Sequence, residues 1–277
     1  MIATSIAVAP NGGRKVKADH PAVPLTAAEL AVTAARCRDA GASMIHAHVR
    51  TADGHHLLDA DAYRDAIAAI RGAVGQDLVI QITSEALGKY APAQQRAVIR
   101  DVRPEAASLA LRELVPDASE EGAFADLLGW MQREAVTPQI ILYDAHDAER
   151  LADFRRRGLV PFAHLPVLYV LGRYTTGQTS APSDLLPFLD SAAPVFEHWS
   201  LCAFGAQETA CVTTGALLGG HIRVGFENNE WLPDGSRAES NEDLVAAARR
   251  AIESAGLKAA TADQLRAATT NKLPGEK

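Results

Sequence analysis

Two histidines separated by one residue, His46 and His48, are the side chains whose types and spacing most directly suggest chemistry. The run from Met44 to Val49 is short and apolar and follows Gly41, which predicts a buried strand after a turn. Because residues two apart on a strand share a face, the two imidazoles would lie side by side. Neutral imidazoles held in this way suit a metal ion, most commonly zinc. The same pattern also fits two hydrogen-bonded histidines of a core or cleft, so the surrounding elements must decide.

Apolar stretches typical of strands alternate with amphipathic stretches typical of helices along the whole chain. The expected strands are residues 2–9, 44–49, 78–83, 106–110, 138–143, 164–171, 198–203 and 220–225. The expected helices are residues 26–40, 59–71, 92–101, 119–135, 148–157, 183–189, 206–218 and 241–255. Thr26 and Glu29 form a capping box at the first helix, and Ser240 is the expected N-cap of the last.

This alternation predicts the fold. Strand–helix units in strict order imply parallel pairing, and eight units in 277 residues match a closed (β/α)₈ TIM barrel that forms one domain over residues 1–277. An open doubly wound sheet is the alternative, although no G-x-G-x-x-G follows the first strand. Active sites of such barrels lie at the C-terminal ends of the strands, where His46 and His48 stand. The barrel therefore favours the metal interpretation of the two histidines.

Composition limits the class of protein. A net charge of −7 and 48% hydrophobic residues describe an acidic, soluble globular protein without the basic patch of a nucleic-acid binder. No apolar run is long enough to cross a membrane, and the N-terminus does not resemble a signal peptide. Cys37, Cys202 and Cys211 are widely spaced and form no C-x-x-C motif. We therefore expect a cytoplasmic protein with neither nucleic-acid nor membrane partners.

A third metal ligand should come from another strand end. Glu227 stands just after the eighth strand, and strands one, two and eight are neighbours in a closed barrel. Two imidazoles and one carboxylate leave coordination positions for substrate or water, which is the pattern of a catalytic zinc site. A solvated acid in a loop is the alternative interpretation of Glu227.

Further polar residues stand at the predicted strand ends. Arg223, on the eighth strand, could anchor a substrate carboxylate through two hydrogen bonds, and Arg50 could do the same or form an ion pair at the rim. Thr83 and Ser108 close the third and fourth strands, where each hydroxyl could bind a ligand or serve only the turn. The polar loop at residues 172–178 is long enough to cover a site. Four other histidines are expected at the surface or in loops: His55, His56, His146 and His164.

Several segments in order along the chain resemble one known family. They are ADHPAVPLT at residues 18–26, HAHVR at 46–50, VLG at 170–172, GGHIRVGFENN at 219–229 and AESN at 238–241. Together they resemble the β-keto acid cleavage enzymes, and the resemblance runs nearly from end to end.

The resemblance implies a zinc-dependent TIM barrel, usually a homotetramer. Such enzymes convert a β-keto acid and acetyl-CoA, the co-substrate, into acetoacetate and a new acyl-CoA through a metal-stabilised enolate. On this resemblance the family's metal ligands fall on His46, His48 and Glu227. Its substrate-anchoring hydroxyls fall on Thr83 and Ser108, and its arginine falls on Arg223.

The sequence departs from the family's pattern at the catalytic base. Asn228 occupies the position where the described member of the family has an aspartate that abstracts the proton. An asparagine amide has no titratable acceptor for a proton, so Asn228 cannot take that role. Glu85, two residues beyond Thr83, is the candidate substitute, and Asp144 after the fifth strand is a second one.

A second departure concerns the substrate. Arg14 stands where the described member has a glutamate that meets the substrate's amino group. A cation at that position favours a substrate whose far end is neutral or anionic, such as a β-keto dicarboxylate. Lys15 and Lys17 could instead meet the phosphates of CoA, with Arg14 adding to that basic rim.

Two other functions remain open from the sequence. A metal-dependent aldolase or decarboxylase would use the same metal and enolate chemistry on a keto acid without CoA, and Asn228 adds weight to this alternative. A barrel that only binds a metal and a ligand is the non-enzymatic alternative.

Overall fold

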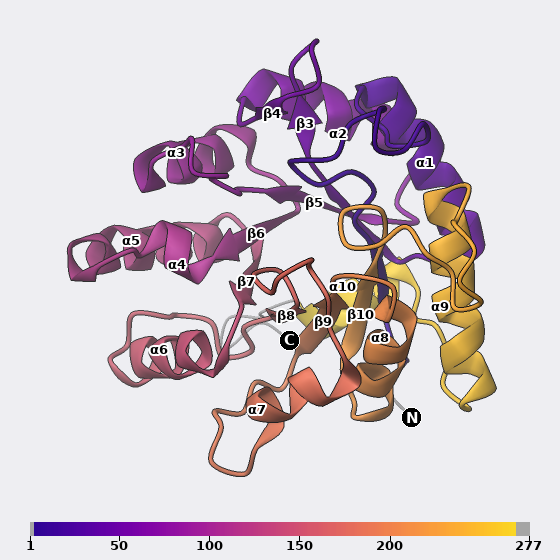
Figure 1. Cartoon of the computed structure of the whole chain (residues 1–277). Helices are drawn as coiled ribbons and strands as arrows, with labels where there is room; N and C mark the ends of the chain where they lie inside the picture. Colours follow the sequence, from indigo (N-terminus) through magenta and orange to yellow (C-terminus); the bar gives the residue numbers. More distant parts are fainter. Residues whose placement is uncertain (1–2, 270–277) are drawn as a thin grey trace.

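The computed structural model describes residues 3–269, and its strands close into a barrel (Figure 1). Every pairing in the ring is parallel, in the order β1, β10, β9, β8, β7, β6, β5, β2 and back to β1. The strands are β1 (Ile6–Val8), β2 (Met44–Ala47), β5 (Val79–Thr83), β6 (Ala106–Ala110), β7 (Thr137–Leu142), β8 (Val167–Leu171), β9 (Trp199–Ala203) and β10 (His221–Val224). The TIM barrel is thus confirmed, and the open doubly wound sheet is excluded.

Helices lie outside the ring of strands, as Figure 1 shows. They are α1 (Ala27–Ala40), α2 (Ala60–Val74), α3 (Pro92–Val102), α4 (Leu111–Leu114), α5 (Glu121–Arg133), α6 (Ala145–Arg156), α7 (Leu186–Leu189), α8 (Glu208–Leu217) and α9 (Asn241–Ser254). Thr26 and Glu29 make the predicted capping box of α1, and Ser240 is the N-cap of α9. The fourth unit differs from the expected single helix, because α4 and a 3₁₀ turn (Ala118–Glu120) precede α5.

The second unit also differs from the prediction. The strand expected over residues 44–49 ends at Ala47, since β5 pairs with β2 only as far as Ala47. The chain then forms a separate antiparallel hairpin of β3 (Val49–Arg50) and β4 (His56–Leu57). This hairpin carries His56 back toward the end of β2.

The largest apolar core fills the space between the strands and the helices. A smaller cluster closes the N-terminal end of the barrel, where Ala262 and Leu265 of α10 (Ala262–Thr269) pack on the first residues of three strands, Met44, Val79 and Ala106. The opposite end is therefore left for a site. Ile2, which was included in the first predicted strand, lies outside the described residues.

No helix between residues 3 and 269 combines the length and apolar character needed to span a bilayer. Cys37, Cys202 and Cys211 are free and buried.

Candidate active site

The two histidines and the late carboxylate meet at the C-terminal end of the barrel. His46 lies on β2 and His48 directly follows it, while Glu227 lies three residues beyond β10. The two Nε2 atoms are 3.1 Å apart, and Glu227 Oε2 is 3.4 Å from His48 Nε2 and 3.6 Å from His46 Nε2. The three predicted ligands therefore form one cluster, because β1 alone separates β2 from β10.

Two glycines allow Glu227 to reach this position. Gly225 has a φ of +134°, and a Cβ there would lie 2.5 Å from the carbonyl oxygen of Ala9, the residue that follows β1. Gly12 has a φ of +58°, and its Cβ would lie 2.6 Å from Glu227 Cγ. Only glycine tolerates such backbone angles and such close approach at low cost. The Glu227 amide donates to Ala9 O across 3.1 Å, which fixes the turn over β1.

The donor atoms suit a divalent metal such as zinc. Burial lowers the pKa of His46 to about 4 and that of His48 to about 3, so both imidazoles are neutral at neutral pH. Burial alone would raise the pKa of Glu227, but Arg223 and the histidines bring it well below its usual range. Glu227 Oε2 is buried and has no hydrogen-bond partner among residues 3–269. Two neutral imidazoles and one ionised carboxylate with an unpartnered oxygen form a donor set that zinc prefers.

Arg223 points its guanidinium into the same site from β10. It is 3% exposed, and its Nη2 donates to Glu227 Oε1 (3.2 Å) and to Cys202 Sγ (3.3 Å). Its Nε and Nη1 are buried without an acceptor in the described chain. A buried cation with unused donors is costly, so Arg223 is suited to bind a ligand's carboxylate.

Thr83 and Ser108 lie side by side on adjacent strands. They are register partners of β5 and β6, their hydroxyl oxygens are 3.5 Å apart, and they are 2% and 1% exposed. Both line one cavity together with the candidate metal ligands; its polar lining includes His46, His48, Thr83, Ser108, Arg223 and Glu227.

Glu85 lines the same cavity. Its Oε2 is 3.8 Å from His48 Nδ1, and its Oε1 accepts from Arg173 Nη2 across 3.3 Å. Burial, followed by the nearby charge of Glu227, raises the pKa of Glu85 to about 7. A carboxylate with such a pKa can exchange a proton with a substrate near neutral pH.

Asp144, the second candidate for the base, and Asn228 both lie outside this cavity. Asn228 is buried, and its side-chain amide finds no hydrogen-bond partner within residues 3–269. It does not line the cavity that holds Glu85. Asp144 is the N-cap of α6 and pairs with Arg112 (2.8 Å), again away from this cavity. Among the proposed bases, only Glu85 reaches the site.

A second, outer cavity adjoins the cavity that contains Thr83 and Ser108 and shares four lining residues with it: Glu85, Arg173, Phe204 and Glu227. Arg14 lines this outer cavity and is exposed. Lys15 also lines it but pairs with Glu230 (2.5 Å). Lys17 pairs with Glu29 (2.7 Å) and does not line it.

Arg50 has a structural role in this arrangement. Its Nε donates to Gly12 O (3.0 Å) and its Nη1 to Gly54 O (2.6 Å). It therefore holds two loops together through their backbone carbonyls, in place of the substrate contact or rim ion pair considered from the sequence.

Three residues of the site were not predicted from the sequence. His56, expected at the surface, is 3% exposed; its ring lies 5.4 Å from that of His48, and its Nε2 donates to Glu85 O (2.8 Å). Arg173 was included only as part of a covering loop. Gln81 accepts from His46 Nδ1 across 2.7 Å. Its polarity within an apolar strand, two residues from Thr83, was the available signal.

Sequence comparison connects nearly the whole chain with known proteins. A model of the family described as "beta-keto acid cleavage enzyme" matches residues 3–270. A Fusobacterium nucleatum subsp. nucleatum protein named 3-keto-5-aminohexanoate cleavage enzyme is 29% identical over 260 residues, covering 92% of this chain and 93% of the relative. A Cupriavidus necator protein named 3-oxoadipate:acetyl-CoA acetyltransferase is 27% identical over 270 residues, covering 95% of this chain and 93% of the relative.

Structural comparison gives the same fold. A solved ternary complex of ObcA with a C4-CoA adduct and oxalate has a TM-score of 0.73 and 18% sequence identity. The match covers 90% of this chain and 67% of that chain. At this identity the likeness shows the shared barrel alone.

Proposed function

The chain belongs to the beta-keto acid cleavage enzyme family, and we propose that it is a zinc-dependent acyltransferase. It would convert a β-keto acid and acetyl-CoA into acetoacetate and a new acyl-CoA. The convergence of His46, His48 and Glu227 around an unpartnered carboxylate oxygen, in a cavity with the Arg223 guanidinium, is the observation that carries this proposal. Two relatives whose names specify keto acids support the substrate class, and one of these names includes acetyl-CoA.

The proposed reaction balances without an oxidant or reductant. The carbon between the carboxylate and the ketone of the keto acid loses a proton and bonds to the acetyl carbon of acetyl-CoA, and the CoA thiolate leaves. The thiolate then attacks the original ketone carbon, and the bond from that carbon to the new acetoacetyl unit breaks. The proton returns to the released carbon, which gives acetoacetate and the acyl-CoA.

Each residue of the site has a role in this scheme. Zinc held by His46, His48 and Glu227 would supply Lewis-acid stabilisation of the negative charge that develops on the keto acid. Arg223 binds the substrate carboxylate through its free Nε and Nη1 donors. Thr83 and Ser108 donate hydroxyl hydrogen bonds from the neighbouring strand ends, so that the substrate is oriented before the proton is lost.

Glu85 is the proton acceptor of this proposal. Its carboxylate lines the cavity beside His48, whereas Asp144 caps α6 and Asn228 has no titratable group. The ion pair with Arg173 holds the carboxylate in place between turnovers. The family's pattern has its base at the position of Asn228. In this chain we assign that role to Glu85, which follows β5.

The far end of the substrate is expected to be neutral or anionic. Arg173 in the outer cavity is paired with Glu85, whereas Arg14 is an exposed cation at its lining, so an ammonium group beside Arg14 would meet a like charge. The second carboxylate of a β-keto dicarboxylate would be attracted to Arg14. The relative named for 3-oxoadipate, which is such a dicarboxylate, supports this choice.

The assembly and the location of the enzyme belong to the same proposal. The family resemblance predicts a homotetramer, which light scattering on the purified protein measures directly. The three free, buried cysteines fit the reducing conditions of the predicted cytoplasmic location.

One experiment tests the activity. Zinc-loaded protein is incubated with acetyl-CoA and a panel of β-keto acids, and new acyl thioesters are identified by mass. We expect a new acyl-CoA and acetoacetate in equal amounts. Turnover that needs no acetyl-CoA would instead favour the aldolase or decarboxylase alternative, and tight binding without turnover would favour the ligand-binding barrel.

A further inference from the structure

Three polar side chains cross the barrel interior next to the candidate metal site. Gln81 lies on β5, Gln139 on β7 and Ser200 on β9, and they are 1%, 8% and 7% exposed. These strands alternate around the ring, and side chains from alternate strands form one layer of a TIM barrel. Such layers are usually filled by Val, Ile and Leu. A polar layer at this depth therefore needs an explanation.

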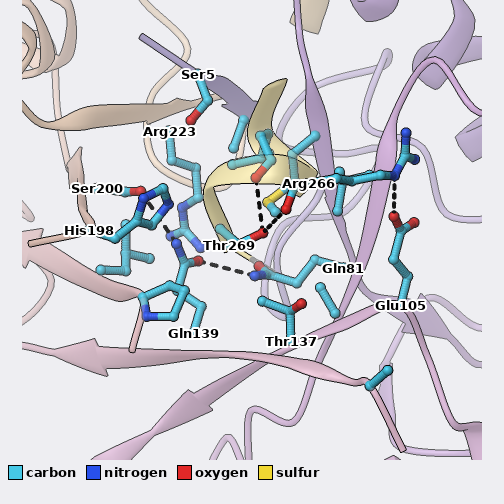
Figure 2. A pocket seen from close by; sticks show the side chains of 18 residues that line it. Ser5, Gln81, Glu105, Thr137, Gln139, His198, Ser200, Arg223, Arg266 and Thr269 are labelled. Atoms are coloured by element: carbon cyan, nitrogen blue, oxygen red, sulfur yellow. Dashed lines mark hydrogen bonds and ion pairs between the residues drawn. The ribbon is translucent and has the colours of Figure 1, made fainter. Parts of the chain in front are cut away.

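Hydrogen bonds link this layer to a candidate metal ligand. His46 Nδ1 lies 2.7 Å from Gln81 Oε1. Gln81 Nε2 donates to Gln139 Oε1 across 3.1 Å, and Gln139 Nε2 donates to Ser200 Oγ across 3.4 Å. Figure 2 shows the two bonds between the labelled residues Gln81, Gln139 and Ser200. In each of these hydrogen bonds the donor lies on the His46 side and the acceptor on the Ser200 side, so the chain of bonds has one direction.

The direction of this chain decides which nitrogen of His46 carries the proton. Gln81 Oε1 can only accept, so His46 Nδ1 must donate to it and Nε2 keeps its lone pair. That lone pair faces His48 and Glu227. The reverse order of donors would also satisfy both amides, since the Ser200 hydroxyl can donate as well as accept. It would, however, place the proton on Nε2, where a metal would have to bind.

Close packing does not hold the amides in this orientation. On the side away from the candidate metal site, Gln81, Gln139 and Ser200 line a cavity of about 200 Å³ near the N-terminal end of the barrel. Arg266 and Thr269 of α10 line the same cavity (Figure 2). The hydrogen bonds between the side chains, in place of close packing on that face, must therefore set the orientation of each amide.

We propose that Gln81 is a positioning residue that keeps His46 in the tautomer required for metal binding, and that Gln139 and Ser200 hold the Gln81 amide in the required orientation. The proposal rests on the zinc site of the proposed function. In this proposal the polar layer orients His46 before the metal binds. The hydrogen-bond partner of a metal-binding histidine fixes the tautomer and the ring orientation of that histidine.

The tautomer of His46 can be measured without metal or activity. Nitrogen-15 NMR of the metal-free protein at neutral pH distinguishes Nδ1–H from Nε2–H imidazoles. We expect His46 to carry its proton on Nδ1 in the wild-type protein and to lose this preference in Gln81→Leu. A wild-type His46 protonated on Nε2 would overturn the proposal even if every variant failed to fold.

Zinc affinity, measured by competition with a chelator, provides the second readout. Gln81→Leu should weaken zinc binding about 10–100-fold, the range found when such a partner is removed. Gln139→Leu should weaken it less, because Gln81 remains but is no longer oriented. Gln139→Glu keeps an acceptor for Gln81 Nε2 and should restore the affinity. Equal affinities for Gln81→Leu and the wild type would contradict the proposal.

A matched control separates this effect from the loss of any buried amide. Gln95 is also fully buried, and its Nε2 donates to Ser84 O (2.6 Å) outside the polar layer. Gln95→Leu should reduce stability while leaving the His46 tautomer and zinc affinity unchanged. If the wild-type protein binds no zinc, the proposed function fails, whereas the NMR measurement still decides whether Gln81 controls the tautomer. A zinc loss in Gln95→Leu equal to that in Gln81→Leu would show a general structural effect and refute the proposal.

Discussion

Arg173 and Glu85 form an ion pair across the candidate site, with 3.3 Å between Nη2 and Oε1. Glu85 follows β5 and Arg173 follows β8, and these two strands are not hydrogen-bonded neighbours in the ring. The pair therefore places the proposed base over the cavity from two separate parts of the barrel. A substrate that reaches Glu85 must lie beside Arg173. The residue that acts as base therefore also determines which charged group the substrate meets.

Removal of one imidazole tests the metal site. His46→Ala or His48→Ala should reduce bound zinc to trace levels and activity to background, because two remaining ligands hold the ion poorly. Metal content by mass spectrometry and turnover of acetyl-CoA are the measurements. His55→Ala, which changes an exposed histidine, should keep both. Unchanged zinc in His46→Ala and His48→Ala would contradict the ligand assignment.

Replacement of Glu85 tests the base. Glu85→Gln should lower kcat by about 10²–10⁴-fold, the usual contribution of general base catalysis, while zinc content stays constant. Asp144→Asn is the matched control, because Asn caps a helix as well as Asp does and should preserve activity. A loss of activity in Asp144→Asn with a normal rate in Glu85→Gln would assign the base to Asp144.

Charge reversal at Arg14 tests the substrate preference. Arg14→Glu should lower kcat/KM for a β-keto dicarboxylate roughly fivefold, since Arg14 is exposed and its interactions are screened. The same change should raise kcat/KM for an amino-substituted keto acid. Lys17→Glu changes an equal charge outside the outer cavity and should leave both values close to wild type. A wild-type preference for the aminated substrate would refute the proposed substrate class.

His221 should make stability depend on pH. Burial lowers its pKa in the folded protein to about 4, and its Nδ1 accepts from Ser5 N across 3.0 Å. The unfolded chain binds this proton at about pH 6.5, so the stabilisation is complete above that pH and is lost as the pH falls toward 4. The steepest loss is about 1.4 kcal/mol per pH unit.

Urea denaturation between pH 7.5 and 4.5 measures this contribution. His221→Asn removes the titrating group, so the wild-type free energy of unfolding should fall more steeply with acid than that of the variant. His146→Asn, at an exposed position, should run parallel to the wild type. Parallel curves for His221→Asn and the wild type would show that His221 does not contribute.

Local patterns in the sequence were enough for the barrel and for part of the site. Hydrophobic periodicity and caps such as Thr26 and Ser240 depend on neighbouring residues, so alternating strands and helices could be predicted from them. The two-residue period of a strand placed His46 and His48 on one face. Ring closure then implied that Glu227 comes close to both.

Only the tertiary structure decided how the remaining side chains are used. The β3–β4 hairpin buries His56 beside His48, and the loop after β8 brings Arg173 to Glu85. The register of β2 and β5 places Gln81 directly beside His46. Contacts of this kind join residues far apart in the chain and depend on strand register and on the paths of loops. Local sequence patterns do not specify either of these.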